Sequence, residues 1–136
     1  MRAIFFQIKN NKSKLQKIVE IAYYHFSKNE KILFISADDS SVQFVDDLLW
    51  KTPKTSFLPH FTSSTYIDEK VVVTSKRENL NNAKYIFNLC PNPLMLDDIN
   101  IIYEFEDFTA SGKLQLSRKK YELYKERKFF IESMLS

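Results

Sequence analysis

The sequence predicts an α/β fold, a three-layer α/β/α domain around a mostly parallel central sheet of about four or five strands. Strand and helix patterns alternate along the first 50 residues with short connections, which favours right-handed crossovers between parallel strands. The segment KILFISA, at 31–37, is almost continuously apolar, as is typical of a strand buried on both faces. A chain of 136 residues has room for one domain, which we take as 1–136.

Each element of the N-terminal half has its own signal. The apolar run AIFFQI, at 3–8, is rich in strand formers and predicts the first strand. A capping-box pattern opens at Ser13 and precedes apolar residues at helical spacing, which predicts a helix to about residue 28. A second capping box at Ser40 predicts another helix, which ends near Trp50.

The C-terminal half contains further strands and one helix. Residues 51–65 hold prolines and show no periodicity, which predicts an irregular connection. A final helix is expected from Ser111 to about Ser133. Further strands are expected at 71–75, 85–89 and 99–105. The whole order is Rossmann-like in its connectivity.

Glycine is the most informative residue type in the composition. Gly112 is the single glycine, where an average usage of ~7% would give about nine or ten. Phosphate-binding loops, both the P-loop and the dinucleotide-binding turn, need several glycines at fixed spacing. The fold is therefore predicted without any nucleotide-binding motif, and we expect no nucleotide cofactor.

The sequence offers few residues for a metal site or a disulfide bond. Cys90 is the single cysteine, so the chain has no disulfide framework, which fits a reducing compartment. His25 and His60 lie far apart, and two distant histidines with one cysteine do not match the spacing of a zinc site. We expect no metal ion, and we interpret His25 as a packed or half-exposed residue of the first helix.

The sequence gives no sign of a membrane protein. No apolar run reaches the ~18 residues that cross a bilayer, and the apolar part of the N-terminus is too short for a signal peptide. We therefore expect a cytoplasmic protein that does not bind a membrane.

No recognisable catalytic group is present. Asp38 and Asp39 follow the 31–37 strand, where a metal or ribose contact is one interpretation, but an acidic pair beside a helix N-terminus is preferred. His60 has serines near it, yet the glycines of a nucleophile elbow are absent. We interpret His60 as a structural or contact residue and Cys90 as an inert buried thiol, and we expect no catalytic residue.

One aromatic stretch lies outside any periodic element. Residues 50–61 contain the only tryptophan, two phenylalanines and two prolines. Rings on loops stiffened by proline are typical anchors of a protein interface. The same rings could instead cap the end of the sheet and belong to the core, and the sequence leaves both interpretations open.

The positive charge is concentrated near the C-terminus. Residues 113–128 hold seven basic and two acidic side chains, a balance of +5, whereas the net charge of the whole chain is +3. Such a segment is most often a solvated helix face, but it also suits an acidic peptide or a phosphate backbone. The small overall charge favours the acidic peptide over a dedicated nucleic-acid binder.

The residues DDLLWKTPKTSFLPH, at 46–60, resemble the stretch D-x-x-L-W-x-x-P-x-x-S-F-x-P-H of the chi subunit of bacterial DNA polymerase III. The final basic helix also resembles that family through the pattern R-x-x-Y-x-x-Y at Arg118, Tyr121 and Tyr124. The resemblance implies a non-catalytic subunit of a DNA-directed DNA polymerase complex, accessory to its clamp loader. It also implies an α/β fold that binds no nucleotide.

Chi-like proteins join two partners, and the resemblance implies both here. One is the psi subunit of the clamp loader, and the other is the acidic C-terminal tail of single-stranded-DNA-binding protein, so that DNA is reached only indirectly. The residues that match the psi-contacting region are Trp50, Pro53, Phe57, Pro59 and His60. Arg118 and Tyr121 match the tail-binding region, with Lys113 near a further family lysine; helical spacing adds Leu114 and Tyr124 one turn to either side.

Two alternatives come from other classes of protein. A small nucleic-acid-binding module would place the 113–128 helix on phosphates and bind bare single-stranded DNA with a steep salt dependence. An enzyme of Rossmann-like fold is disfavoured because glycines and a catalytic group are missing. A chi-like adaptor should meet DNA only through its protein partner.

Overall fold

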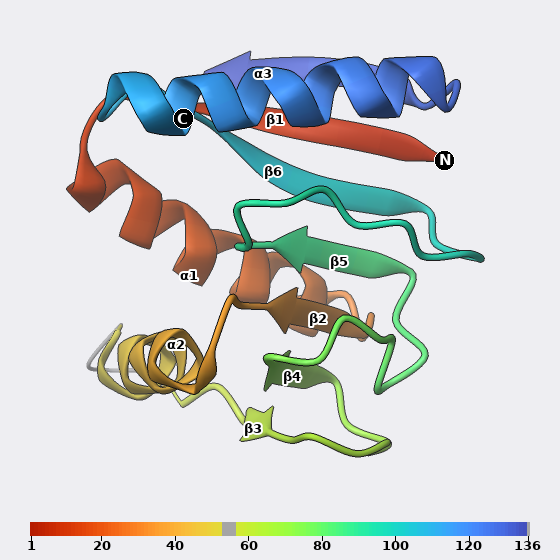
Figure 1. Cartoon of the computed structure of the whole chain (residues 1–136). Coiled ribbons are helices and arrows are strands. Elements are labelled where there is room, and N and C mark those ends of the chain that lie inside the picture. The colour runs from red at the N-terminus through yellow and green to blue at the C-terminus, as the bar shows by residue number, and fades with distance from the viewer. Residues whose placement is uncertain (53–56, 136) are drawn as a thin grey trace.

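One seven-stranded sheet runs through the protein (Figure 1). The computed structural model describes residues 1–52 and 57–135. The described strands pair in parallel in the order β3-β4-β2-β5-β6-β1-β7. The predicted α/β class is confirmed, but the sheet has seven strands and not four or five. The elements are β1 (Arg2–Ile8), α1 (Asn11–Ser27), β2 (Ile32–Ile35), α2 (Asp39–Lys51), β3 (Phe61–Thr62), β4 (Val71–Thr74), β5 (Tyr85–Asn88), β6 (Ile101–Asp107), α3 (Ser111–Glu126) and β7 (Phe130–Leu135).

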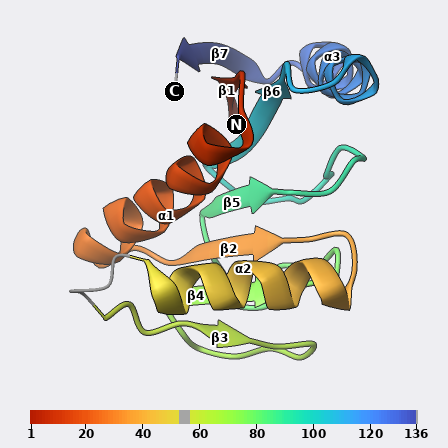
Figure 2. The same cartoon turned by 90° about the vertical axis from the view of Figure 1, so that its left-hand side faces the viewer.

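The helices cover both faces of the sheet (Figure 2). α1 and α2 share a hydrophobic core with Ile4 and Phe6 of β1, whereas α3 shares a second core with Ala3 and Phe5. Successive side chains of a strand point to opposite faces, so β1 contributes to both cores. β2 is buried along its whole length, as the apolar run at 31–37 predicts.

Both N-terminal helices begin earlier than predicted, and the serine caps are wrong. Asn10 caps α1 through its Oδ1 atom, which accepts a hydrogen bond from the backbone N–H of Ser13 at 2.8 Å. Asp38 caps α2 in the same way, with the N–H of Ser41 as donor at 2.8 Å. Each first turn is thus closed by an amide or carboxylate oxygen. The bond from Ser41 also lowers the pKa of Asp38. Asp38 lies at the helix N-terminus, as the sequence predicts, but it caps the helix in place of the predicted Ser40.

The last helix is shorter than predicted and is followed by a strand. α3 ends at Glu126, and Lys128 adopts a φ of 64°. The backbone N–H of Phe129 then donates to the carbonyl of Tyr124 at 2.9 Å, and β7 pairs with β1 at the edge of the sheet. Aromatic and β-branched residues fit a strand, and the pairing with β1 satisfies their backbone groups.

The stretch that was predicted to be irregular contains one short strand. Phe61–Thr62 forms β3 at the other edge of the sheet and pairs with Val72 and Val73 of β4. Two residues are too few to give a periodic pattern, so this strand is defined only by a long-range pairing. Its position fixes the end of the loop that carries Phe57 and His60.

A buried histidine ties α1 to the sheet. The Nε2 atom of His25 lies 2.6 Å from the hydroxyl of Tyr103, and Nδ1 lies 3.0 Å from a carboxylate oxygen of Glu30. The ring also stacks on Tyr85, with centroids 4.2 Å apart. Burial lowers the pKa of His25, although Glu30 opposes this effect.

We expect the protein to lose stability as the pH falls below about 6.5, because the unfolded chain then gains a proton at His25 that the folded chain resists. The stability that neutral His25 contributes is fully present above that pH. Because one proton is involved, the free energy of unfolding changes by at most about 1.4 kcal/mol per pH unit. Urea unfolding of the wild type and of His25→Gln between pH 5.5 and 7.5 measures this slope. An unchanged slope in the variant would contradict the assignment.

Candidate functional site

Two exposed aromatic rings lie together at the end of α2. Trp50 is 51% exposed and Phe57 is 65% exposed, and their ring centroids are 5.4 Å apart. Large apolar rings in water are favourable places for a partner to bind. Of the two interpretations that the sequence leaves open for residues 50–61, a place in the core does not fit the exposure of these two rings. Pro53, which the sequence groups with them, lies outside the described residues.

His60 lies beneath Trp50 and connects the loop to α2. Its ring is buried against Trp50, with centroids 4.5 Å apart. Nδ1 lies 2.7 Å from the carbonyl oxygen of Leu58, and Nε2 lies 3.1 Å from Oδ1 of Asp46 on α2. These contacts tie the loop to the helix beside Trp50, so His60 supports the Trp50 ring. Pro59, next to it, is half-buried.

The middle of α3 faces the sheet. Ser117 and Lys120 are buried although they belong to the basic segment, and Tyr124 is fully buried. The Tyr124 hydroxyl donates a hydrogen bond to Oε2 of Glu104 at 2.6 Å. Tyr124 therefore lies under the helix, and the structure does not bring it to the surface beside Arg118.

Three other residues chosen from the sequence do share a side of α3. Leu114, Arg118 and Tyr121, here called the α3 flank, follow one another at helical spacing. Arg118 is exposed and makes no ion pair with any described residue, whereas Leu114 and Tyr121 are half-buried. The Tyr121 ring packs on Phe5 of β1, with centroids 5.8 Å apart. This flank joins an unpaired guanidinium to a partly apolar floor.

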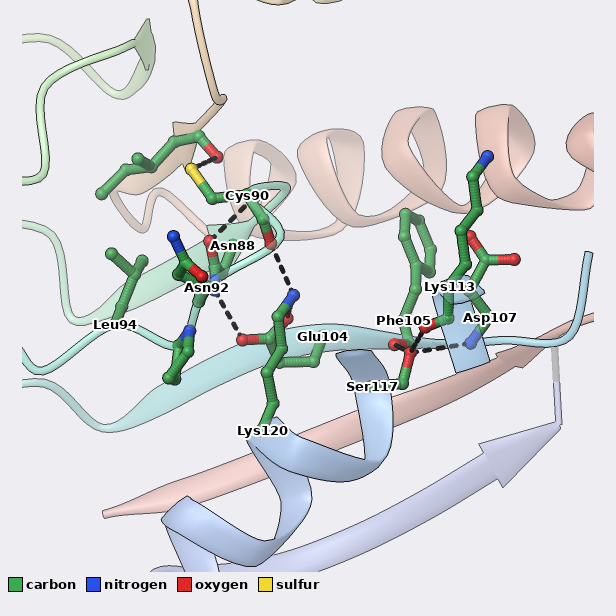
Figure 3. Close-up of polar contacts among 12 residues, drawn as sticks. Asn88, Cys90, Asn92, Leu94, Glu104, Phe105, Asp107, Lys113, Ser117 and Lys120 are labelled. Atoms are coloured by element: carbon green, nitrogen blue, oxygen red, sulfur yellow. Dashed lines mark hydrogen bonds and ion pairs between the residues drawn. The ribbon is translucent and has the colours of Figure 1, made fainter. Parts of the chain in front are cut away.

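A buried ionic network holds α3 against the sheet (Figure 3). Lys120 Nζ donates to Oε1 of Glu104 at 2.8 Å and to the carbonyl of Cys90 at 2.6 Å. Asn88 Nδ2 and the Tyr124 hydroxyl donate to Oε2 of Glu104 at 2.7 and 2.6 Å. Burial raises the pKa of Glu104, and Lys120 and the hydrogen bonds oppose this rise. The network therefore supports α3 from below.

The family of the chain follows from a comparison of sequences. The family model described as DNA polymerase III chi subunit, HolC, matches residues 1–132. The chain belongs to this family. The resemblance inferred from the motif at 46–60 is thus confirmed, and membership indicates a role in DNA replication as a subunit of polymerase III. No curated protein shows a significant match to the chain.

The chi-family match extends beyond the segments that first indicated it. It includes both the aromatic pair of Trp50 and Phe57 and the whole of α3, and it ends at residue 132, inside β7.

Within residues 1–52 and 57–135, no group of three or more His, Cys, Asp or Glu side chains could hold a metal ion. No helix in the same residues has both the length and the apolar character to cross a membrane.

A cavity of about 580 Å³ opens where α1, α2 and α3 begin. The strands that precede these helices, β1, β2 and β6, are parallel, so their carboxyl ends meet at this edge. Lys113 lines the cavity, whereas the residues of the α3 flank do not, so Lys113 does not belong to that flank. Cys90 also lines it, and burial raises the pKa of this thiol, in keeping with an inert residue.

Sequence reasoning missed two features of this region. Glu104 falls in the strand predicted at 99–105 without a predicted role, although a carboxylate in a buried strand is a signal that a cation lies nearby. Phe44 falls in the helix predicted after Ser40 without a predicted role, and the structure shows it 55% exposed at the cavity. A large apolar residue on the polar side of a helix is the signal that could have found it.

Proposed function

We propose that this chain is a non-catalytic accessory subunit that joins the clamp loader, through psi, to the acidic C-terminal tail of single-stranded-DNA-binding protein. The observation that carries the proposal is the pair of dissimilar exposed surfaces on different elements. The aromatic rings lie at the end of α2, and the α3 flank lies on the helix that covers the opposite face of the sheet (Figures 1 and 2). Two surfaces that face different ways suit a protein that binds two partners at once.

The psi contact is assigned to the aromatic rings. Trp50 and Phe57 are exposed, and His60 below Trp50 is held by contacts to Leu58 and Asp46, so the Trp50 ring has a firm support. Tryptophan in a braced position is a frequent hot spot of protein interfaces. Pro59 and Pro53 complete the proposed contact because they match the family motif, with Pro53 outside the described residues.

The tail contact is assigned to the α3 flank. An acidic C-terminal tail offers carboxylates and an apolar last side chain, and a guanidinium can hold a carboxylate through two hydrogen bonds. Arg118 supplies that guanidinium, and Leu114 and Tyr121 supply an apolar floor. Tyr124 supports the helix from below.

Arg118→Glu should weaken the binding of a labelled tail peptide by tenfold or more. The substitution removes the group that faces the carboxylates and puts a like charge in its place, and about 1.4 kcal/mol is a factor of ten. Fluorescence anisotropy measures the affinity. Lys119→Glu is the matched control, because it makes the same charge change at a neighbouring exposed position outside the flank. Equal losses in both variants would mean that α3 is only a solvated basic face.

The linking role itself is tested with both partners present. Size-exclusion chromatography of the chain with psi and single-stranded-DNA-binding protein should give one complex that contains all three. A titration of the chain alone with bare single-stranded DNA should show no binding at physiological salt. Tight binding to bare DNA with a steep salt dependence would instead favour a nucleic-acid-binding module.

A further inference from the structure

The cavity at the carboxyl edge of the sheet has the size and place of a ligand site. Its volume of about 580 Å³ lies within the range of roughly 300–1,000 Å³ that is usual for ligand pockets. Parallel α/β sheets bind their ligands beyond the carboxyl ends of their strands. Neither Trp50 nor Arg118 lines the cavity, so the proposed function leaves it without a role.

Apolar side chains from all three helices form its wall. Leu15 comes from α1, Phe44 from α2 and Leu116 from α3. Phe44 and Leu116 are exposed although both are large and apolar. A ligand with an apolar body would remove this surface from water.

One buried polar atom lines the cavity without a partner. Ser36 follows β2 and is 1% exposed, and its Oγ atom has no hydrogen-bond partner among the described residues. A buried hydroxyl is normally paired, because leaving it unpaired lowers stability. The atom is therefore suited to a hydrogen-bonding group of a ligand that enters the cavity.

The charged residue of the cavity wall that has no ion-pair partner among the described residues is a lysine. Among its basic residues, Lys14 is paired with Asp107, and Lys120 is paired with Glu104. Lys113 is exposed and makes no ion pair with any described residue, and its side chain extends past Asp107 (Figure 3).

The start of α3 adds to this positive field. No side chain caps the first turn of α3 at its N-cap residue Ala110, so the partial positive charge of the helix start is not offset there. Lys113 stands in that same first turn. Together the ammonium group and the helix start favour an anionic group at the Lys113 side of the cavity.

We propose that this cavity binds a small amphipathic carboxylate. Its carboxylate is held by Lys113, its apolar body lies against Leu15, Phe44 and Leu116, and a polar atom at the far end reaches Ser36. β5 lies between β2, which Ser36 follows, and β6, which leads to α3, so the carboxyl ends of β2 and β6 are about 10 Å apart. An unbranched acid of about eight carbons with a terminal hydroxyl group matches this separation.

NMR titration of the full chain with octanoate tests the carboxylate part of the proposal. We expect saturable shifts of the amides of Ser36, Phe44 and Lys113, and at least tenfold weaker binding of 1-octanol, which lacks the charge. Lys113→Gln should weaken octanoate by about tenfold and leave 1-octanol unchanged. Lys119→Gln, on the same helix but outside the cavity, should change neither. Equal binding of octanoate and 1-octanol, or no saturable shift, would overturn the proposal.

A second pair of probes tests the role of Ser36. 8-Hydroxyoctanoate should bind the wild type more tightly than octanoate does, because its hydroxyl pairs with Ser36 Oγ. Ser36→Ala should remove this preference while octanoate still binds. A preference that survives in Ser36→Ala would overturn the assignment. The inference is independent of the proposed function, since tail-peptide and psi binding are measured separately.

Discussion

Replacing Lys120 by methionine should lower the free energy of unfolding by about 3–5 kcal/mol, because it leaves the Glu104 carboxylate buried without a cation. Glu104 has no exposed surface, and Lys120 Nζ is its only cationic partner in the described residues. The carbonyl of Cys90 would lose its donor as well. Urea unfolding followed by circular dichroism at pH 7 measures the change as a lower midpoint with an unchanged slope.

The double variant Glu104→Gln/Lys120→Met is the control for this loss. It removes both charges but keeps an oxygen that accepts from Tyr124 and Asn88, so most of the stability should return. The loss in Lys120→Met should also shrink as the pH falls. Burial raises the pKa of Glu104, so protonation of this carboxyl in the folded state relieves the unpaired charge. A loss under about 1 kcal/mol, as for an exposed ion pair, would contradict the network's importance.

Local sequence patterns predict an element correctly where its own apolar residues determine how it is buried. The apolar run of β2 and the helical spacing of α1 and α2 predict buried elements that the structure contains. β7 could not be predicted in this way, because the aromatic residues of 121–130 also fit a continuing helix. The positive φ of Lys128 and the pairing of β7 with β1, more than 120 residues away in sequence, decide against the helix. Neither is visible in a local window.

The same limit applies to the site on α3. Arg118, Tyr121 and Tyr124 follow one another in steps of three, and each step falls about 60° short of a full turn in a helix of 3.6 residues per turn. Two steps therefore move the side chain by about 120°, from the exposed Arg118 to the buried Tyr124. The spacing predicts correctly that adjacent members share a flank, but not that all three do. The sequence groups Lys120 with the solvated charges of 113–128, because its partner Glu104 belongs to a different element.

Trp50→Ala should lower the affinity for psi by at least about 2 kcal/mol, roughly 30-fold, while the fold stays intact. The ring is 51% exposed, so its removal leaves no large cavity in the core, and Phe57→Ala should act in the same direction. Isothermal titration calorimetry with psi measures the affinity, and thermal unfolding monitors the fold. Phe44→Ala is the matched control, because Phe44 lies on the same helix with 55% exposure, but six residues before Trp50 and at the cavity. If Trp50→Ala unfolds the protein, or if Phe44→Ala weakens psi binding equally, the rings at the end of α2 are not the anchor of this interface.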